Sequence, residues 1–131
     1  MTKPKTLESN QILRTTKENF VDLTLNTIYK GKQVLIFNNS KNSSEATAEK
    51  VAIANKIVEN AKELEIIANK ILKSLQSPTR QCRRLAKCIQ KGAAFHHSGL
   101  TGKQRTLVET NFKSGLIKVI SSTPTLAAGL N

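Results

Sequence analysis

Three short apolar runs, separated by segments with helical spacing, constrain the fold of this chain more than any other feature. The runs are residues 33–37, 93–95 and 116–120. The first is continuous rather than alternating, which is typical of a strand that is covered on both faces of a parallel sheet. Strands that alternate with helices favour right-handed crossovers. The pattern therefore predicts an α/β fold with a parallel sheet.

Helical patterns precede the first strand and follow the second. From Lys17 the apolar spacing predicts a short helix that ends near Gly31, a residue able to adopt a left-handed cap. Residues 101–113 predict another helix, between the second and third strands. Residues 1–16 are polar and lack periodicity, as in a linker or a segment that leads into a domain.

A long helical region separates the first two strands and forms a predicted insert over residues 43–91. After a polar loop, Ser43 or Ser44 can cap its first helix. A single apolar stripe then predicts either one core-facing helix or a helix pair broken near Asn60. The members of this stripe are Ile57, Ala61, Leu64, Ala68, Ile71 and Leu75.

Positive charge is concentrated in the second half of the chain. Residues 66–131 contain eleven lysines or arginines against one acid, Glu109, and so carry +10 of the net charge of +12. Such asymmetry suggests a polyanionic partner, because lysines and arginines placed at phosphates release condensed counterions. The alternative is a basic, solvated surface that aids solubility. A basic amphipathic helix predicted over residues 79–90 presents three arginines largely outward as surface charge, or alternatively for contact with DNA or a partner: Arg80, Arg83 and Arg84.

The chain lacks residues that autonomous nucleotide hydrolysis requires. Residues 99–103 look like the end of a phosphate-binding P-loop, but His97 and Gln104 stand where that motif needs glycine and Ser or Thr. Asp22 is the only aspartate, so an Asp-Glu pair that could hold Mg²⁺ cannot be assembled. We therefore assign no catalytic residue to the chain by itself.

The two cysteines, Cys82 and Cys88, form no CxxC pair and are interpreted as reduced, intracellular thiols. Their spacing from His96 and His97 is unfavourable for a metal site, so no metal is predicted. No apolar run approaches the ~20 residues that cross a bilayer, and no signal peptide is visible. We expect a cytoplasmic protein without membrane contact.

Two adjacent histidines follow the second strand. In a strand, the rings of His96 and His97 would point to opposite faces of the sheet. Either ring could contact a ligand or act as a general base, although no orienting carboxylate stands near them in the sequence. The alternative is one structural histidine, hydrogen-bonded in the sheet, and one exposed histidine.

The last eleven residues follow the third strand and supply hydroxyls, a proline turn and a glycine where a parallel strand would hand over to a helix. Ligand sites in α/β folds lie at this kind of junction. A helix start is predicted at Thr125. Because the chain ends at Asn131 inside this motif-like segment, we expect it to be a piece of a larger protein.

Four blocks together resemble one family. They are residues 33–37, residues 92–100, Arg105 with Val108, Glu109 and Phe112, and residues 123–131. In this order they are similar to the archaeal repair helicases of the superkiller-like branch of helicase superfamily two, also called Holliday-junction-migration helicases. The resemblance runs from about residue 26 to the end. It implies a truncated second RecA-like motor domain with three layers over residues 17–131, a domain that lacks the P-loop and acidic box.

The resemblance also implies contacts with nucleic acid. Ser40 and Lys41 would belong to motif IV, where the family usually has Ser or Thr followed by Arg; lysine keeps the charge but loses the bidentate fork. Residues 95–100 resemble the segment that touches the tracked strand through phosphate contacts without sequence information. The candidate contacts there are the side chains of His96, His97 and Ser98 and the backbone of Gly99.

Residues 123–131 look like motif V, which lies between the two ligands of such helicases. By analogy, Thr123 and Thr125 would hold a phosphate, helped by amides at a helix N-terminus. Gly129 and Asn131 would face a nucleotide bound mainly by the first RecA-like domain. The arginine finger of motif VI would lie beyond this chain.

The resemblance therefore implies a segment of an ATP-dependent DNA helicase that acts in repair and recombination. Its cofactor would be ATP with Mg²⁺ in the full-length protein, and its partners single-stranded or branched DNA and the first RecA-like domain. ATP would close the two domains and shift their grip along the strand. The isolated chain is expected to be inactive. The alternatives are a stand-alone basic nucleic-acid-binding module, an RNA helicase fragment of the same branch, or a structural fragment.

Overall fold

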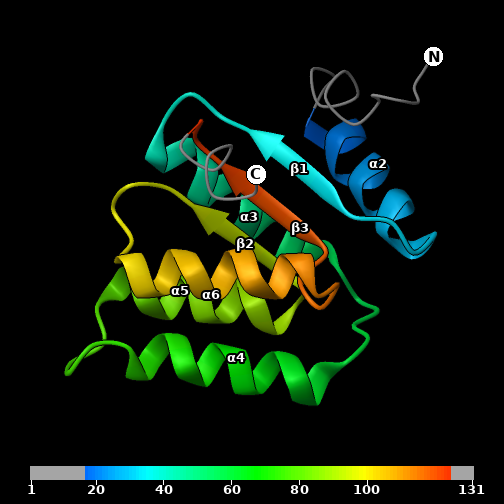
Figure 1. Cartoon of the computed structure of the whole chain (residues 1–131). Helices are drawn as coiled ribbons and strands as arrows, with labels where there is room; N and C mark the ends of the chain where they lie inside the picture. The colour runs from blue at the N-terminus through cyan, green and yellow to red at the C-terminus, as the bar shows by residue number, and fades with distance from the viewer. Residues whose placement is uncertain (1–16, 125–131) are drawn as a thin grey trace.

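The computed structural model describes residues 17–124 of the chain, which form five helices and three strands in this range. Figure 1 shows their arrangement. In chain order the elements are α2 (Lys17–Tyr29), β1 (Val34–Phe37), α3 (Lys41–Ala54), α4 (Ala61–Lys73), α5 (Arg80–Gln90), β2 (Ala93–His96), α6 (Gly102–Lys113) and β3 (Val119–Ser122).

The three strands form one parallel sheet in the order β1-β3-β2. Val119 of the central strand pairs with Val34 on one side and with Ala93 on the other. Both neighbours of β3 therefore begin in the same register and end at the same edge. The predicted α/β fold with a parallel sheet is confirmed.

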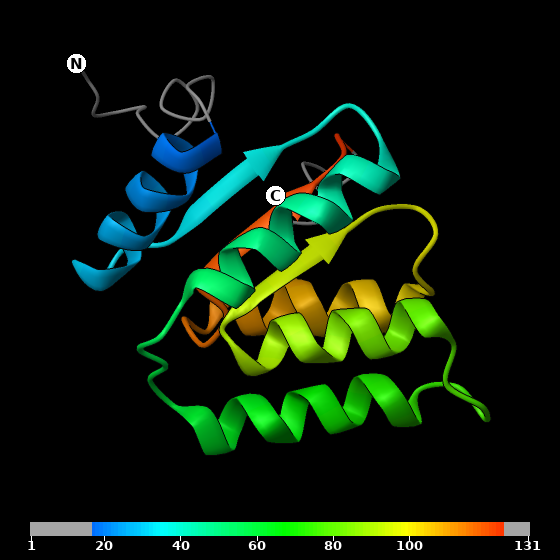
Figure 2. The same ribbon diagram turned by 180° about the vertical axis from the view of Figure 1, so that it is seen from behind.

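Helices lie on both faces of this sheet. Figures 1 and 2 show α3 on one face and α6 on the other, with α5 next to α3 and α4 outside α5, beyond β2. The crossovers β1-to-β2 and β2-to-β3 run in opposite directions across the sheet and on opposite faces, so they share one handedness. The core between the layers contains fully buried Phe95, Leu85, Ile89 and Ile120.

Two predictions about the strands, one boundary and one burial pattern, differ from the structure. The third strand was expected over residues 116–120 but runs from Val119 to Ser122. The amides of Leu116 and Ile117 instead donate to the carbonyl of Asn111, closing the end of α6 after the left-handed Gly115 (φ 92°). The first strand was expected to be fully buried, but Phe37 is 47% exposed, because β1 is an edge strand of the described sheet.

The helical region between β1 and β2 is broken near Asn60, which was one of the two arrangements expected from the apolar stripe. α3 ends at Ala54 and α4 begins at Ala61, after Asn60 in the left-handed region (φ 60°). Ile57, expected in the apolar stripe, lies in this connection and is exposed. The helix start expected at Ser43 or Ser44 is also wrong: α3 begins at Lys41, and the Ser40 hydroxyl caps it by accepting from the amide of Ser43 at 3.1 Å. The assignment of residues 43–91 as an insert relative to the family stays a prediction.

Candidate nucleic-acid interface

The carboxyl ends of all three strands lie at one edge of the sheet, where α3, α5 and α6 begin (Figure 1). Hydrogen bonds join the chain segments that leave the strands there. The main-chain N–H of Asn38 donates to the carbonyl of Ser122 at 2.7 Å, and the main-chain N–H of Thr123 donates to the carbonyl of His96 at 3.2 Å. The predicted contacts of motif IV, the histidine block and the start of motif V are thus collected at this edge. Thr125, Gly129 and Asn131 lie outside the described residues.

Ser40 and Lys41 form the start of α3. The Ser40 hydroxyl serves as the N-cap, so its oxygen is engaged with the first turn of the helix. Lys41 is the first helical residue and is exposed. The main-chain amides of the first helical residues have no intrahelical acceptor, so this turn offers N–H donors beside an ammonium group. The arrangement suits an anion.

The loop after β2 is held in one conformation by internal hydrogen bonds. The Gly99 amide donates to His97 Nδ1 at 3.0 Å, and the Leu100 amide donates to the His97 carbonyl at 3.2 Å. Arg105 Nη1 donates to the Leu100 carbonyl at 2.5 Å. Ser98 and Gly99 are exposed at the tip of the loop. The Gly99 amide, a predicted phosphate donor, is therefore engaged within the chain.

The following helix start anchors this loop to the insert. Thr101 and Gln104 form a capping box at the N-terminus of α6. The buried Gln104 amide nitrogen also donates to Ser74 Oγ at 3.1 Å and to Cys82 Sγ at 3.0 Å. One side chain thereby joins α6 to the end of α4 and to α5.

The two histidine rings point to opposite faces of the sheet, as predicted. His96 Nε2 lies 2.7 Å from Glu109 Oε2 on α6, and His97 Nε2 lies 2.7 Å from Glu45 Oε2 on α3. Both side chains are buried, so the alternative in which one histidine is exposed is wrong. His96 Nδ1 has no hydrogen-bond partner within residues 17–124. Direct contact of either ring with nucleic acid stays a prediction.

Sequence reasoning missed the carboxylate partners of these histidines. Glu109 is 13 residues from His96, and Glu45 is 52 residues from His97. The signal for Glu109 was available, because it is the only acid in the basic half of the chain and stands on a predicted helix after the histidines. No local pattern connects Glu45 with His97, because only the packing of α3 on β2 brings them together.

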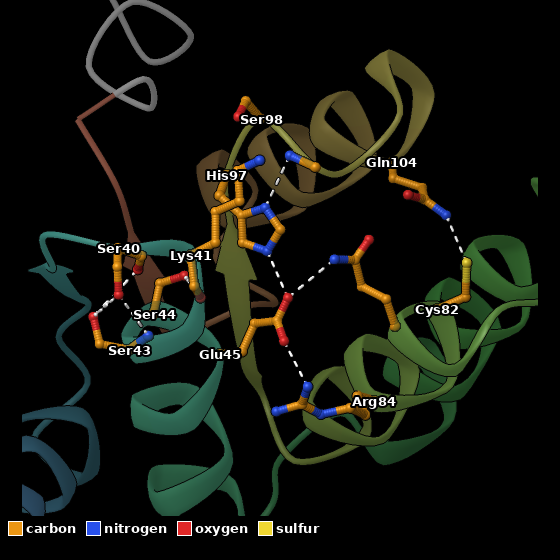
Figure 3. Close-up of polar contacts among 12 residues, drawn as sticks. Ser40, Lys41, Ser43, Ser44, Glu45, Cys82, Arg84, His97, Ser98 and Gln104 are labelled. Atoms are coloured by element: carbon orange, nitrogen blue, oxygen red, sulfur yellow. Dashed lines mark hydrogen bonds and ion pairs between the residues drawn. The ribbon is translucent and has the colours of Figure 1, made fainter.

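Arg84 on α5 contacts the same carboxylate, Glu45, that is bonded to His97 (Figure 3). Its Nη1 lies 2.6 Å from Glu45 Oε1, and its Nε lies 2.7 Å from Glu49 Oε2. Hydrogen bonding to Arg84 lowers the pKa of Glu49, and the same bond raises the pKa of Arg84. The interpretation of Arg84 as outward surface charge is therefore wrong, because α3 presents two carboxylates to this side of α5.

The two thiols are free and buried. Burial raises the pKa of Cys88 to about 12, so this thiol stays protonated near neutral pH. Residues 17–124 contain no group of three or more His, Cys, Asp or Glu that could hold a metal ion. Among the helices in the same range, none has both the length and the apolar character needed to span a membrane.

The helices that begin at the strand-end edge carry bases where acids are usual. Lys41 and Arg80 are the first residues of α3 and α5, and Lys103 is the second residue of α6. None of the three helices has an acid in its first turn. Because the N-terminal end of a helix dipole is positive, each base costs about 0.3–1 kcal/mol of helix stability. The edge therefore concentrates positive charge against local stability, as functional sites often do.

Replacing Gly99 by alanine is expected to disturb this edge without unfolding the chain. A Cβ at Gly99 would lie 2.9 Å from His97 Cε1 and 3.0 Å from His97 Nδ1. The ring cannot retreat, because it is buried and stacked on Phe95 with centroids 5.6 Å apart. We expect a loss of about 1–2 kcal/mol in urea unfolding, with amide shifts confined to the loop. Gly102→Ala, whose nearest neighbour is the flexible end of Arg105 at 4.0 Å, is the control and should change little.

Comparisons with known proteins give consistent matches. The chain is 43% identical over 112 residues, or 83% of its length, to the ATP-dependent DNA helicase Hel308 of Methanocella arvoryzae. It is 40% identical over 116 residues to Hel308 of Methanococcus vannielii, and 38% identical over 125 residues to Hel308 of Methanocaldococcus jannaschii. These matches cover 88% and 95% of the chain. The chain spans only 10–15% of the length of these relatives. No family model matches it.

Proposed function

We propose that this chain, a homologue of one segment of the archaeal Hel308 DNA helicases, works as part of the second motor domain of an ATP-dependent DNA helicase. Its role there is to grip the phosphates of one nucleic-acid strand. The observation that supports the proposal is the concentration of positive charge at the edge of the sheet where the strands end. Three helices begin there with exposed bases and no acid in the first turn, beside the residues that resemble the helicase motifs.

The chemistry of this edge suits phosphate rather than bases. Lysine and arginine side chains, hydroxyl groups and helix N-termini all donate to phosphate oxygens, and such contacts carry no sequence information. Lys41 and the exposed Ser98 hydroxyl at the loop tip provide donors from two different segments, while the Gly99 amide is already bonded to His97. The aromatic residues give little support for a row of stacked bases, since Phe95 and Phe20 are buried in the core and, among the described residues, Phe37 at the end of β1 is the one aromatic side chain exposed at this edge. A motor that moves along any sequence needs contacts of this kind.

The nucleotide side of the proposal rests on the resemblance alone. Gly129 and Asn131 would face ATP and Mg²⁺ held mainly by the first RecA-like domain, and Thr125 would continue the phosphate grip. Thr123, which begins this segment, is already joined to the sheet through the His96 carbonyl. Domain closure on ATP would then move the whole edge as one body, because hydrogen bonds connect the segments that form it. Branched DNA as substrate and a cytoplasmic location belong to the same proposal.

Fluorescence anisotropy of the full chain with a labelled single strand tests this proposal. We expect binding at low salt whose affinity falls roughly 30-fold between about 50 and 250 mM salt, the dependence expected for about three phosphate contacts to a single strand. The chain alone should release no phosphate from ATP above background. No binding at the lowest salt, or binding that salt does not weaken, would contradict the proposal. An RNA strand of matched sequence is the comparison, and clearly tighter binding of RNA would favour the RNA helicase alternative.

A further inference from the structure

Glu45 is a buried residue of α3 that lies between two segments of the proposed phosphate site, the start of α3 at Lys41 and the loop after β2. It stands four residues, about one helical turn, after Lys41 on α3, and its side chain is 7% exposed. Its Oε1 accepts from Arg84 Nη1 at 2.6 Å. Its Oε2 accepts from Gln81 Nε2 at 3.0 Å and lies 2.7 Å from His97 Nε2. A buried carboxylate is tolerated only when such partners remain in place, so the geometry around it is tightly determined.

The partners of the His97 ring define one tautomer. The Gly99 amide donates to Nδ1, so Nδ1 carries no proton and Nε2 carries it. The Nε2–H group then donates to Glu45. The Phe95 ring lies parallel to the imidazole, with an angle of 6° between the planes, and restricts its tilt. Glu45 and the Gly99 amide therefore favour the same tautomer of His97, with Nε2–H toward α3 and unprotonated Nδ1 toward the loop.

This ring in turn determines the conformation of the loop tip. Two hydrogen bonds, from the main-chain amides of Gly99 and Leu100, close the turn onto His97. Ser98, which lies between His97 and Gly99 in this turn, is exposed. In Figure 3 the Lys41 side chain extends from the first turn of α3 in the direction of Ser98. A carboxylate on α3 thus sets the position of the loop that faces the basic start of the same helix.

We infer that Glu45 is a positioning residue of the phosphate grip, acting through the tautomer of His97 and the Gly99 amide. The inference rests on the proposed function and adds to it a residue that touches no nucleic acid. Glu45 keeps Ser98 and Lys41 in the arrangement that one phosphate can contact. Loss of Glu45 should weaken binding by releasing the loop, even though the charge of the chain becomes more positive.

The first test uses the unmodified chain. Long-range ¹H–¹⁵N NMR spectra report which ring nitrogen of His97 carries the proton, and amide hydrogen exchange reports on Gly99. We expect the Nε2–H tautomer and a Gly99 amide that is protected although its residue is exposed. The Nδ1–H tautomer, or unprotected exchange at Gly99, would overturn the inference without any variant.

The second test compares Glu45→Gln with Glu49→Gln. Glutamine has one acceptor oxygen where Glu45 has two, and we expect that oxygen to face the charged guanidinium of Arg84. The NH₂ group then replaces the oxygen that accepts from Gln81 and His97. Glu49 is the matched control, because its carboxylate accepts hydrogen bonds from the same Arg84 and makes none with His97. For Glu45→Gln we expect about tenfold faster exchange at Gly99 and roughly fivefold weaker DNA binding, the loss of about one hydrogen bond. For Glu49→Gln both quantities should stay within about twofold.

The outcomes separate this inference from the proposed function. If the unmodified chain fails to bind DNA, the proposed function is wrong. If it binds DNA and both glutamine variants behave alike, the proposed phosphate binding is supported, but Glu45 only stabilises the fold and the positioning role is wrong. If Glu45→Gln does not fold, the tautomer and exchange of the unmodified chain still decide the question. Tighter binding by Glu45→Gln, as its added net positive charge alone would produce, would also overturn the inference.

Discussion

Replacing Arg84 by methionine is expected to lower the free energy of unfolding by about 3 kcal/mol, near the lower end of the range for breaking a buried ion pair. The methionine would keep the aliphatic packing of the side chain. It would leave Glu45, whose side chain is only 7% exposed, without its charged partner. Because Arg84 is itself 32% exposed, solvent compensates part of the loss and keeps the effect below the upper end of that range. Urea unfolding of the full chain, followed by circular dichroism, measures the change.

Arg83→Met is the matched control for this prediction. Arg83 is the preceding residue on α5 and is exposed, and an isolated surface substitution of this kind usually changes stability by less than about 0.5 kcal/mol. Equal losses in the two variants would show that general charge on α5, rather than the pair with α3, supports the fold. A change in the slope of the urea transition would show instead that the denatured state had changed.

The same arginine should make stability depend on pH. Arg84 lowers the pKa of Glu49 below its ordinary value of 4.5, so the folded state binds this proton less readily than the unfolded state. The resulting contribution to stability is present above pH 4.5 and is lost as the pH falls through the lower, folded-state pKa. Arg84→Met should remove it. Unfolding midpoints measured between about pH 3 and 7 should therefore fall less steeply with acid in the variant than in the unmodified chain.

The order of elements could be predicted from the sequence, because it depends on local patterns. Apolar runs and helical spacing are properties of neighbouring residues. They placed the three strands to within a few residues and offered the break before α4 as one of two alternatives. The errors occurred where a capping side chain determines the start of a helix, or where a neighbouring element determines the burial of a strand residue. Ser40 rather than Ser43 caps α3, and Phe37 is exposed because no further strand of the described sheet lies beyond β1. Neither choice follows from residue type alone.

The polar network of the site could not be predicted from the sequence. The segment of residues 95–100 could be located by its resemblance to the family, but the carboxylate that accepts from His97 Nε2 is 52 residues away. The pairing exists only because α3 and α5 pack side by side against β2. The same packing turns Arg84 inward although its two neighbouring arginines on the helix, Arg80 and Arg83, are exposed. Long-range packing thus decides which of several identical side chains take part in the site.

Removing the three bases at the helix starts should weaken nucleic-acid binding and, at the same time, stabilise the fold. For Lys41→Ala, Arg80→Ala and Lys103→Ala combined, we expect about 100-fold weaker binding of a single strand, at roughly 1 kcal/mol per charged contact. The slope of log affinity against log salt should fall by about 2, as expected for three fewer phosphate contacts. The free energy of unfolding should rise by about 1–2 kcal/mol, because each base opposes the dipole of its helix. Anisotropy across a salt series and urea unfolding measure the two effects.

A second triple variant of equal charge separates position from charge. Lys32, Lys56 and Lys113 are also exposed, but they lie before β1, between α3 and α4, and at the end of α6, at the opposite edge of the sheet. Their replacement by alanine lowers the net charge of the chain from +12 by the same three charges. It should weaken binding less than about fivefold, since only long-range attraction is lost. It should not stabilise the fold, because Lys113 favours the C-terminal end of α6. Equal losses of affinity in the two triple variants would mean that the chain attracts polyanions by its overall charge, without a grip at the strand ends.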